Sequence, residues 1–349
     1  MNNARWQKHT FQFQRPSGTS RGVLTKKHSW FIIVNHNNFE YPAIGEASII
    51  DGLSPDNTSD FEQTLDAICD FINEKSEQPP NLDKHPSIKF CYEMLRRDIA
   101  VNGSKILFDN TFTHGVADML INGLIWMGSP EFMEQQINTL ILKGFHCIKI
   151  KIGALDFEKE LSILKLIRSK YGNELEVRVD ANGAFSSEDA LSKLERLSAF
   201  NIHSIEQPIK PRQWKAMERL CQNTPIPIAL DEELIGLVEK EECLAMLSSI
   251  KPQYIILKPS LIGGWNSSDE WIAMAEKHNI GWWATSALES NIGLNAIAQY
   301  TFEKNVLMPQ GLGTGSLFER NFDSPLYLQG EKIKFDPGKT WNLNPLQNE

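Results

Sequence analysis

The stretch Ile148-Lys149-Ile150-Lys151-Ile152-Gly153 alternates apolar and cationic residues with a period of two. On a β-strand this period places Lys149 and Lys151 on one face and the isoleucines on the other. Two ammonium groups on one face of a buried strand are costly unless anionic groups lie nearby. The stretch therefore predicts a strand whose lysine face meets carboxylates from other parts of the chain.

Three carboxylates follow downstream, and each one closes a short apolar run. They are Asp180, Glu206 and Asp231, and Lys258 ends a further run of the same kind. From Lys151 to Lys258 the successive spacings are 29, 26, 25 and 27 residues. Because a strand, a helix and their loops occupy roughly 25–35 residues, we predict successive βα units. In a (β/α) barrel the carboxyl ends of the strands converge on the active site.

The first part of the chain lacks this rhythm. Residues 1–115 predict strands followed by helices, which is an α+β arrangement. The turn formers between residues 14 and 22 indicate a mobile loop. The expected elements are strands over 11–13, 29–34 and 41–48 and helices over 60–74 and 87–101.

The βα rhythm begins after residue 115 and ends in a degenerate eighth unit over 308–315, where we expect a loop. Residues 316–349 lose the pattern and are expected to fold back on the N-terminal part. We therefore predict a (β/α) barrel over 116–315 and an α+β domain made of 1–115 and 316–349. The barrel strands are expected over 121–127, 145–153, 176–180, 203–207, 227–231, 254–258 and 281–287.

The composition excludes several classes of function. The 349 residues carry a formal net charge of −9, which argues against nucleic acid and anionic membranes as partners. Five scattered cysteines without CxxC spacing argue against a disulfide framework or a zinc site and indicate a reducing cytoplasm. Neither a signal peptide nor a membrane span is expected. The sequence predicts a cytoplasmic enzyme with a small-molecule substrate and does not fix its oligomeric state.

The three carboxylates together predict a site for a hard divalent cation. A single aspartate at a strand end is more often a cap or a turn residue, but three converging anions repel one another without a cation. Mg²⁺ takes oxygen ligands and leaves positions for substrate oxygens. Lys151 and Lys258 would flank this cation. Neighbouring cations lower the pKa of a lysine toward about 7–8, where it can accept a proton from a carbon next to a carboxylate.

Five motifs resemble those of the enolase superfamily, in its muconate-cycloisomerase-like subgroup. They are Lys149-x-Lys151, Asp180-Ala181-Asn182, Glu206-Gln207-Pro208, Asp231-Glu232 and Lys258-Pro259-Ser260-Leu261-x-Gly263-Gly264. Within the subgroup the chain is most similar to the o-succinylbenzoate synthases, through Gly45-Glu46-Ala47, Gly52-Leu53-Ser54-Pro55-Asp56, Ile121-Asn122-Gly123-Leu124-Ile125-Trp126, Ser286-Ala287-Leu288-Glu289-Ser290-Asn291-Ile292-Gly293 and Gly311-Leu312-Gly313-Thr314.

The resemblance implies a (β/α)7β barrel, a modified TIM barrel, over 116–315, with an α+β capping domain made of 1–115 and 316–349. It also implies roles for the charged residues of these motifs. It implies Mg²⁺, with Mn²⁺ able to take its place, on Asp180, Glu206 and Asp231. It implies Lys151 as the base and Lys258 as a cation facing the substrate. The reaction implied is the dehydration of 2-succinyl-6-hydroxy-2,4-cyclohexadiene-1-carboxylate to 2-succinylbenzoate, through an enediolate, in menaquinone biosynthesis.

The expected substrate contacts belong to these motifs or to late strand ends. Arg178 precedes Asp180 by two residues, so it faces the same interior and could hold the succinyl carboxylate or pair with an interior acid. Hydroxyl groups at the late strand ends could donate hydrogen bonds or serve ordinary turns. The candidate substrate-binding residues are Lys149, Arg178, Asn182, Ser260, Gly263, Thr285, Ser286 and Thr314.

Two other functions use the same residue types. An N-succinylamino acid racemase or a dipeptide epimerase also needs two lysines on opposite sides of the substrate. Epimerases of the subgroup usually carry Asp-x-Asp near the eighth strand, and residues 309–315 contain no acid. A barrel that binds a ligand without turnover would be favoured by a missing base or metal ligand, and none is missing.

Overall fold

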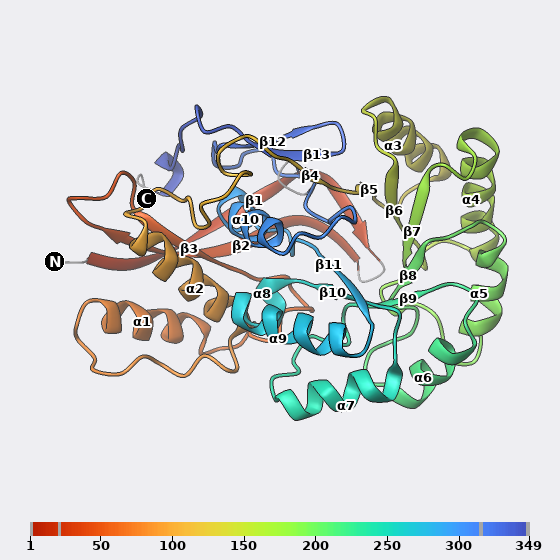
Figure 1. Ribbon diagram of the computed structural model, residues 1–349, viewed down its shortest axis with the longest axis horizontal. Helices are drawn as coiled ribbons and strands as arrows, with labels where there is room; N and C mark the ends of the chain where they lie inside the picture. Colours follow the sequence, from red (N-terminus) through yellow and green to blue (C-terminus); the bar gives the residue numbers. More distant parts are fainter. Residues whose placement is uncertain (1–2, 20–21, 314–316, 347–349) are drawn as a thin grey trace.

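Seven parallel strands curl around a common centre (Figure 1). The computed structural model describes residues 3–19, 22–313 and 317–346. Neighbours in the sheet follow the order β11-β10-β9-β8-β7-β6-β5, which is the arrangement that successive βα units produce. The strands are β5 (Gly123–Ile125), β6 (Cys147–Lys151), β7 (Glu176–Asp180), β8 (Ser204–Glu206), β9 (Ile228–Leu230), β10 (Tyr254–Leu257) and β11 (Gly281–Ala284).

A short segment joins the two outer strands of this sheet in place of an eighth strand. Gln310 makes a parallel bridge to Ile121, just before β5, and Gly311 makes one to Thr285, just after β11. A side chain on residue 311 would lie 2.4 Å from the Thr285 Cγ2 atom, so this close approach requires glycine. The loop expected for the degenerate eighth unit thus closes the barrel.

Helices cover the outside of the barrel (Figure 1). Ser129 caps α3 by accepting a hydrogen bond from the Phe132 amide, and Pro130 takes the first helical position. The core between helices and strands consists mainly of isoleucine, leucine and valine. The helices are α3 (Pro130–Leu142), α4 (Phe157–Tyr171), α5 (Ala190–Ser198), α6 (Trp214–Asn223), α7 (Lys240–Ile250), α8 (Pro259–Ile262), α9 (Gly264–Lys277) and α10 (Asn291–Glu303). No described helix is long and apolar enough to cross a membrane.

The two ends of the chain meet beside the barrel. One antiparallel sheet contains β1 (Asn3–Thr19), β2 (Gly22–Asn35) and β3 (Ala43–Ser48) and packs against α1 (Phe61–Ile72) and α2 (Pro86–Ala100). Near the other end, β12 (Leu326–Gln329) and β13 (Lys332–Phe335) pair with β4 (Met119–Leu120), and a 3-10 helix covers Asn344–Leu346. The Phe318 ring lies 4.8 Å from the Phe11 ring. The exact division into domains stays a prediction.

The segment expected to be a mobile loop is mostly strand. β1 continues to Thr19 and β2 begins at Gly22, with a shift in register between Gln12 and Ser17. The turn formers gave a misleading prediction for residues 14–19, because this stretch finds pairing partners. Ser17 and Thr19 pair with Leu24 and Gly22 of β2, and the amide of Gln14 donates to the Leu317 carbonyl oxygen from the C-terminal part. Strand pairing outweighed local preference here.

Glu93 on α2 ties the N-terminal part of the chain to the barrel. Its carboxylate accepts a hydrogen bond from the Trp265 amide at the start of α9, and burial raises the pKa of Glu93 to about 7 from 4.5. Between pH 4.5 and about 7, Glu93 is protonated to a smaller extent in the unfolded chain than in the folded one. The free energy of unfolding therefore falls as the pH rises through this window.

We expect the difference between wild type and Glu93→Gln to show this titration. Glutamine keeps an acceptor oxygen for the Trp265 amide but does not titrate. From pH 4.5 to 7 the wild type should lose about 3 kcal/mol of stability relative to the variant. Denaturant unfolding of both proteins across this range measures the effect. Parallel pH dependences would contradict the assignment.

Candidate active site

The lysine face of β6 meets the carboxylates of the next strands, as the alternating stretch predicts. Lys151 lies beside Asp180 in the sheet register, and Asp180 lies beside Glu206. The Lys149 Nζ atom is 2.7 Å from Glu206 Oε2 and 3.4 Å from Asp180 Oδ2. The Lys151 Nζ atom is 2.7 Å from Asp180 Oδ2. Both carboxylates are buried.

A second ion pair faces β6 from across the barrel. Lys258, which follows β10, pairs with Asp231, which follows β9. Its Nζ atom also lies 3.6 Å from Glu206 Oε1. The Glu206 carboxylate therefore lies between Lys149 on one side and Lys258 on the other. Three ammonium groups and three buried carboxylates share the centre of the barrel.

The carboxylates keep two of these lysines charged. Burial lowers the pKa of Lys149, but Glu206 and Asp180 attract the ammonium more strongly and hold the pKa above its ordinary value. Burial likewise lowers the pKa of Lys258, and Asp231 and Glu206 outweigh it. The sequence predicted a lowered pKa for the flanking lysines, and for Lys258 the direction is the opposite because the adjacent carboxylates dominate.

Burial and the neighbouring charges shift the pKa values of Asp180 and Asp231 in opposite directions. Burial alone would raise the pKa of Asp180, but Lys151 and Lys149 hold it below its usual range. Burial raises the pKa of Asp231, and Glu232 and Glu206 add to the rise while Lys258 opposes it. Asp180 is therefore more firmly anionic than Asp231.

The three carboxylates point toward the lysines and do not surround one common point. In the described parts of the chain, no group of three or more His, Cys, Asp or Glu side chains is arranged to hold a metal ion. The donor set nevertheless fits a hard cation, because it consists of three buried carboxylates from adjacent strands. Within the described ranges the buried Glu206 Oε1 atom also has no hydrogen-bond partner. A cation here would replace ammonium groups as the neighbour of these oxygens.

A cavity of about 590 Å³ opens over the lysines. Its floor comes from the barrel and its cover from the N-terminal part of the chain. Barrel residues around it include Lys149, Lys151, Asn182, Lys258, Thr285 and Ser286, and residues of the cover include Arg15, Leu24, Ile50 and Leu53. The catalytic candidates Lys151 and Lys258 and four of the proposed substrate contacts, Lys149, Asn182, Thr285 and Ser286, therefore share one cavity that a small molecule can enter.

Asn182 connects Lys151 to a carboxylate that the sequence analysis assigned no role. Its Oδ1 atom accepts a hydrogen bond from Lys151 Nζ at 2.8 Å, and its Nδ2 atom donates to Glu232 Oε1 at 3.0 Å. The residue has φ 45°, in the left-handed region that asparagine tolerates. The sequence feature that could have identified Glu232 as a site residue is its position directly after Asp231.

Arg178 is not brought into this cavity. Its Nε atom donates to Glu176 Oε1 at 2.8 Å and its Nη1 atom to the Pro309 carbonyl oxygen at 2.9 Å, and the guanidinium lies over the Trp283 ring. The alternation correctly placed Arg178 on the inner side of β7. It lies one layer closer to the amino ends of the strands, however, where an interior acid pairs with it.

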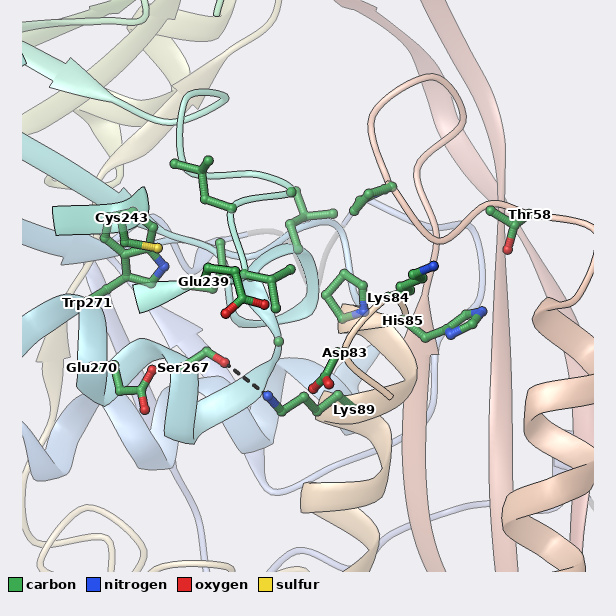
Figure 2. Close-up of a pocket in the computed structure, with 18 of the residues that line it drawn as sticks. Thr58, Asp83, Lys84, His85, Lys89, Glu239, Cys243, Ser267, Glu270 and Trp271 are labelled. Atoms are coloured by element: carbon green, nitrogen blue, oxygen red, sulfur yellow. Dashed lines mark hydrogen bonds between the residues drawn. The ribbon is translucent and has the colours of Figure 1, made fainter. Parts of the chain in front are cut away.

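Three further candidates lie elsewhere or outside the described residues. The Ser260 hydroxyl is buried and donates to Glu289. Gly263 lines a different cavity of about 550 Å³ between the N-terminal part and the outside of the barrel. Figure 2 shows this second cavity, with Lys89 reaching toward Ser267. Thr314 lies outside the residues that the structure describes.

Comparison with known proteins adds independent information. The family model described as "Enolase C-terminal domain-like" matches residues 133–329. The o-succinylbenzoate synthase of Desulfotalea psychrophila is 44% identical over 353 aligned residues, which cover 91% of this chain and 95% of that protein. The crystal structure of MenC from the same organism superposes with a TM-score of 0.85 at 39% identity, covering 95% of this chain and 99% of that one.

More distant relatives share the fold. The L-Ala-D/L-Glu epimerase of Bacillus subtilis is 23% identical over 62% of this chain and 56% of that protein. The structure of its complex with substrate superposes with a TM-score of 0.80 at 17% identity, covering 95% of both chains. At this identity the likeness concerns the fold alone.

Proposed function

Since this chain belongs to the o-succinylbenzoate synthase family of the enolase superfamily, we propose that Lys151 is the base of its dehydration reaction. The enzyme is a carbon–oxygen lyase that converts 2-succinyl-6-hydroxy-2,4-cyclohexadiene-1-carboxylate into 2-succinylbenzoate, a step of menaquinone biosynthesis. The observation that carries the assignment of roles is the pair of lysines facing each other over three buried carboxylates in one cavity.

Lys151 transfers the proton in both halves of the reaction. Its Nζ atom takes the proton from the ring carbon that bears the carboxylate, and the electron pair left on that carbon delocalises into the carboxylate. The ring C–O bond then breaks, and the leaving hydroxide receives the proton from Lys151 and departs as water. The ring becomes aromatic, which drives the step. Asp180 and Asn182 orient the Lys151 amine through the two hydrogen bonds described above.

Lys258 has a different role in this proposal. Its ammonium stays charged beside Asp231 and Glu206 and stabilises the negative charge that develops on the substrate. Mg²⁺ on Asp180, Glu206 and Asp231, replaceable by Mn²⁺, would supply further positive charge to the substrate carboxylate. Lys149 neutralises Glu206 from the opposite side. Thr285 and Ser286 are proposed to contact the substrate from the cavity wall.

Ultraviolet absorbance tests the reaction. Purified protein with Mg²⁺ should remove the diene absorbance of the hydroxycyclohexadiene carboxylate and form the aromatic product. EDTA should stop this conversion. Folded, Mg²⁺-loaded protein that leaves the diene unchanged would rule out the synthase reaction.

Calorimetric titration tests the metal site without any turnover. The wild-type protein should bind Mg²⁺, and Glu206→Gln should bind it at least about tenfold more weakly, because one of three anionic donors is lost. Glu134→Gln on the exposed face of α3 is the matched control and should bind like the wild type. Absence of binding in the wild type, or equal binding in Glu206→Gln, would contradict the proposed ligands.

Racemisation of an N-succinylamino acid is the second candidate activity. It is favoured by the placement of Lys151 and Lys258 on strands β6 and β10, on opposite sides of the barrel. Residues 309–313 contain no acid for an epimerase-type ammonium contact. Deuterium exchange at the α-carbon of N-succinylamino acids in D₂O measures this activity directly.

We also propose a cytoplasmic location and a small carboxylate as the only class of substrate. Support comes from the five cysteines, all free and buried in the described chain, which fit a reducing compartment. The cationic cavity suits a carboxylate rather than a neutral ligand. Gel filtration would measure the oligomeric state.

A further inference from the structure

Glu46, in the middle of β3, reaches across to the barrel. Its carboxylate accepts hydrogen bonds from the Ser290 amide at 2.9 Å, the Ser290 hydroxyl at 2.6 Å and the Gly293 amide at 2.9 Å. These donors form the amino end of α10, where a carboxylate is stabilised by unpaired amides and by the helix dipole. A side chain at residue 293 would lie 2.9 Å from Glu46 Oε2, so the approach requires glycine.

A buried network holds Glu46 in this position. The Ser29 hydroxyl donates to Glu46 Oε1 at 2.7 Å, and Lys27 Nζ donates to Ser29 at 3.1 Å. Lys27 also donates to the Ser48 hydroxyl, which in turn donates to the Ala287 carbonyl oxygen at 3.3 Å. All of these side chains are buried. Because buried polar groups are costly when unpaired, such a network permits few alternative arrangements.

The network converges on the loop between β11 and α10, which forms one wall of the active-site cavity. Residues 285–288 of this loop all line that cavity. Leu288 has φ 61°, a left-handed conformation that costs a leucine free energy and persists only when its surroundings impose it. The Thr285 Oγ1 atom is buried and has no hydrogen-bond partner among the described residues, so a substrate can supply one.

Glu289 links the loop between β11 and α10 to the short helix α8. Its carboxylate accepts a hydrogen bond from the Ala287 amide at 2.7 Å and one from the Ser260 hydroxyl, two residues after Lys258. The wall of the cavity is thus braced both from β3 and from α8, the short helix that follows Lys258. The base Lys151 and its partners lie on β6 and β7, outside this network.

We propose that Glu46 is a positioning residue for substrate binding: it fixes the loop of residues 285–290 so that this wall is preformed when the substrate enters. The inference rests on the proposed function, because the wall matters only if the cavity over the lysines is the active site. A preformed wall lowers KM, since no ordering of the loop opposes binding. The proton-transfer step itself does not pass through Glu46.

The first test compares steady-state kinetics of Glu46→Gln with the wild type. Glutamine replaces one acceptor oxygen by an NH2 group, so one backbone hydrogen bond at the start of α10 is lost, and KM should rise on the order of tenfold while kcat stays within about twofold. Asp98→Asn is the matched control. Asp98 is equally buried and accepts a hydrogen bond from the Ile44 amide of β3, but its partners are Ile44 and Lys105 rather than the cavity wall.

Asp98→Asn should lower thermal stability and leave KM unchanged. An unchanged KM in Glu46→Gln, or an equal rise in Asp98→Asn, would overturn the proposal. Ser290→Ala keeps both carboxylates of the network and removes only one hydroxyl. It should raise KM by about threefold and so serves if Glu46→Gln does not fold.

Hydrogen–deuterium exchange provides a readout that does not depend on turnover. In Glu46→Gln the amides of residues 286–293 should lose protection, while those of β6 and β7 should exchange as in the wild type. Uniform loss of protection, or none, would contradict a positioning role. Failure of the proposed function would appear instead as absence of turnover in the wild type. The exchange pattern and calorimetric affinity for 2-succinylbenzoate would then still decide the role of Glu46.

Discussion

Lys151→Arg is expected to lower kcat by about 10³–10⁴-fold while the protein stays folded. Arginine keeps a positive charge beside the buried Asp180, so the ion pair that stabilises the barrel centre remains. A guanidinium does not release its proton at neutral pH and cannot act as a base. The substitution thus separates the chemical role of Lys151 from its structural one, which Lys151→Ala does less cleanly because it leaves Asp180 with only the more distant Lys149.

The measurement is diene loss by absorbance, with denaturant unfolding of the same samples. Lys159→Arg is the control, since Lys159 is exposed on α4, away from the barrel centre, and should turn over substrate like the wild type. Turnover near the wild-type rate in folded Lys151→Arg would remove Lys151 as the base. An equal loss of kcat in Lys159→Arg would show that the loss in Lys151→Arg does not come from the active site.

The period-two stretch around Lys149 and Lys151 carried most of what could be predicted. It placed both lysines inside the barrel, and the regular spacing placed Asp180 and Glu206 beside them and Asp231 beside Lys258. Such predictions succeed because strand alternation and the length of a βα unit are local properties of the chain. The closing segment around Gln310 was also anticipated as a loop, since glycine and small residues weaken a strand.

The roles of several other residues could not be predicted, and each case has its own physical reason. Periodicity placed Arg178 on the inner face of its strand but left open whether it holds a substrate carboxylate or pairs with an acid, because periodicity gives the face and not the depth in the barrel. In the structure it pairs with Glu176. Ser260 and Gly263 belong to a motif, but the chain turns into α8 directly after Lys258 and carries them away from the cavity. Glu46 was part of a motif without a role, since its partners lie about 245 residues further along the chain.

The second large effect is expected at Lys258, and it should depend on charge rather than on proton transfer. Lys258→Met removes the ammonium that faces Asp231 and Glu206 and should lower kcat by about 10²–10³-fold. Lys258→Arg keeps the charge and should retain at least about tenfold more activity than Lys258→Met. At position 151 arginine should offer no such rescue.

This contrast between positions 151 and 258 distinguishes dehydration from racemisation. A dehydration with Lys151 as sole base needs only a cation at Lys258, whereas racemisation needs a lysine that exchanges protons on each side. If Lys258→Arg loses as much activity as Lys258→Met, a positive charge at position 258 is not sufficient for activity, and Lys258 itself exchanges protons.

Denaturant unfolding must accompany the kinetics, because Lys258→Met leaves Asp231 buried without its ion-pair partner and should cost about 3–5 kcal/mol of stability. Lys258→Arg avoids that loss, so a low rate in this variant would reflect chemistry and not unfolding.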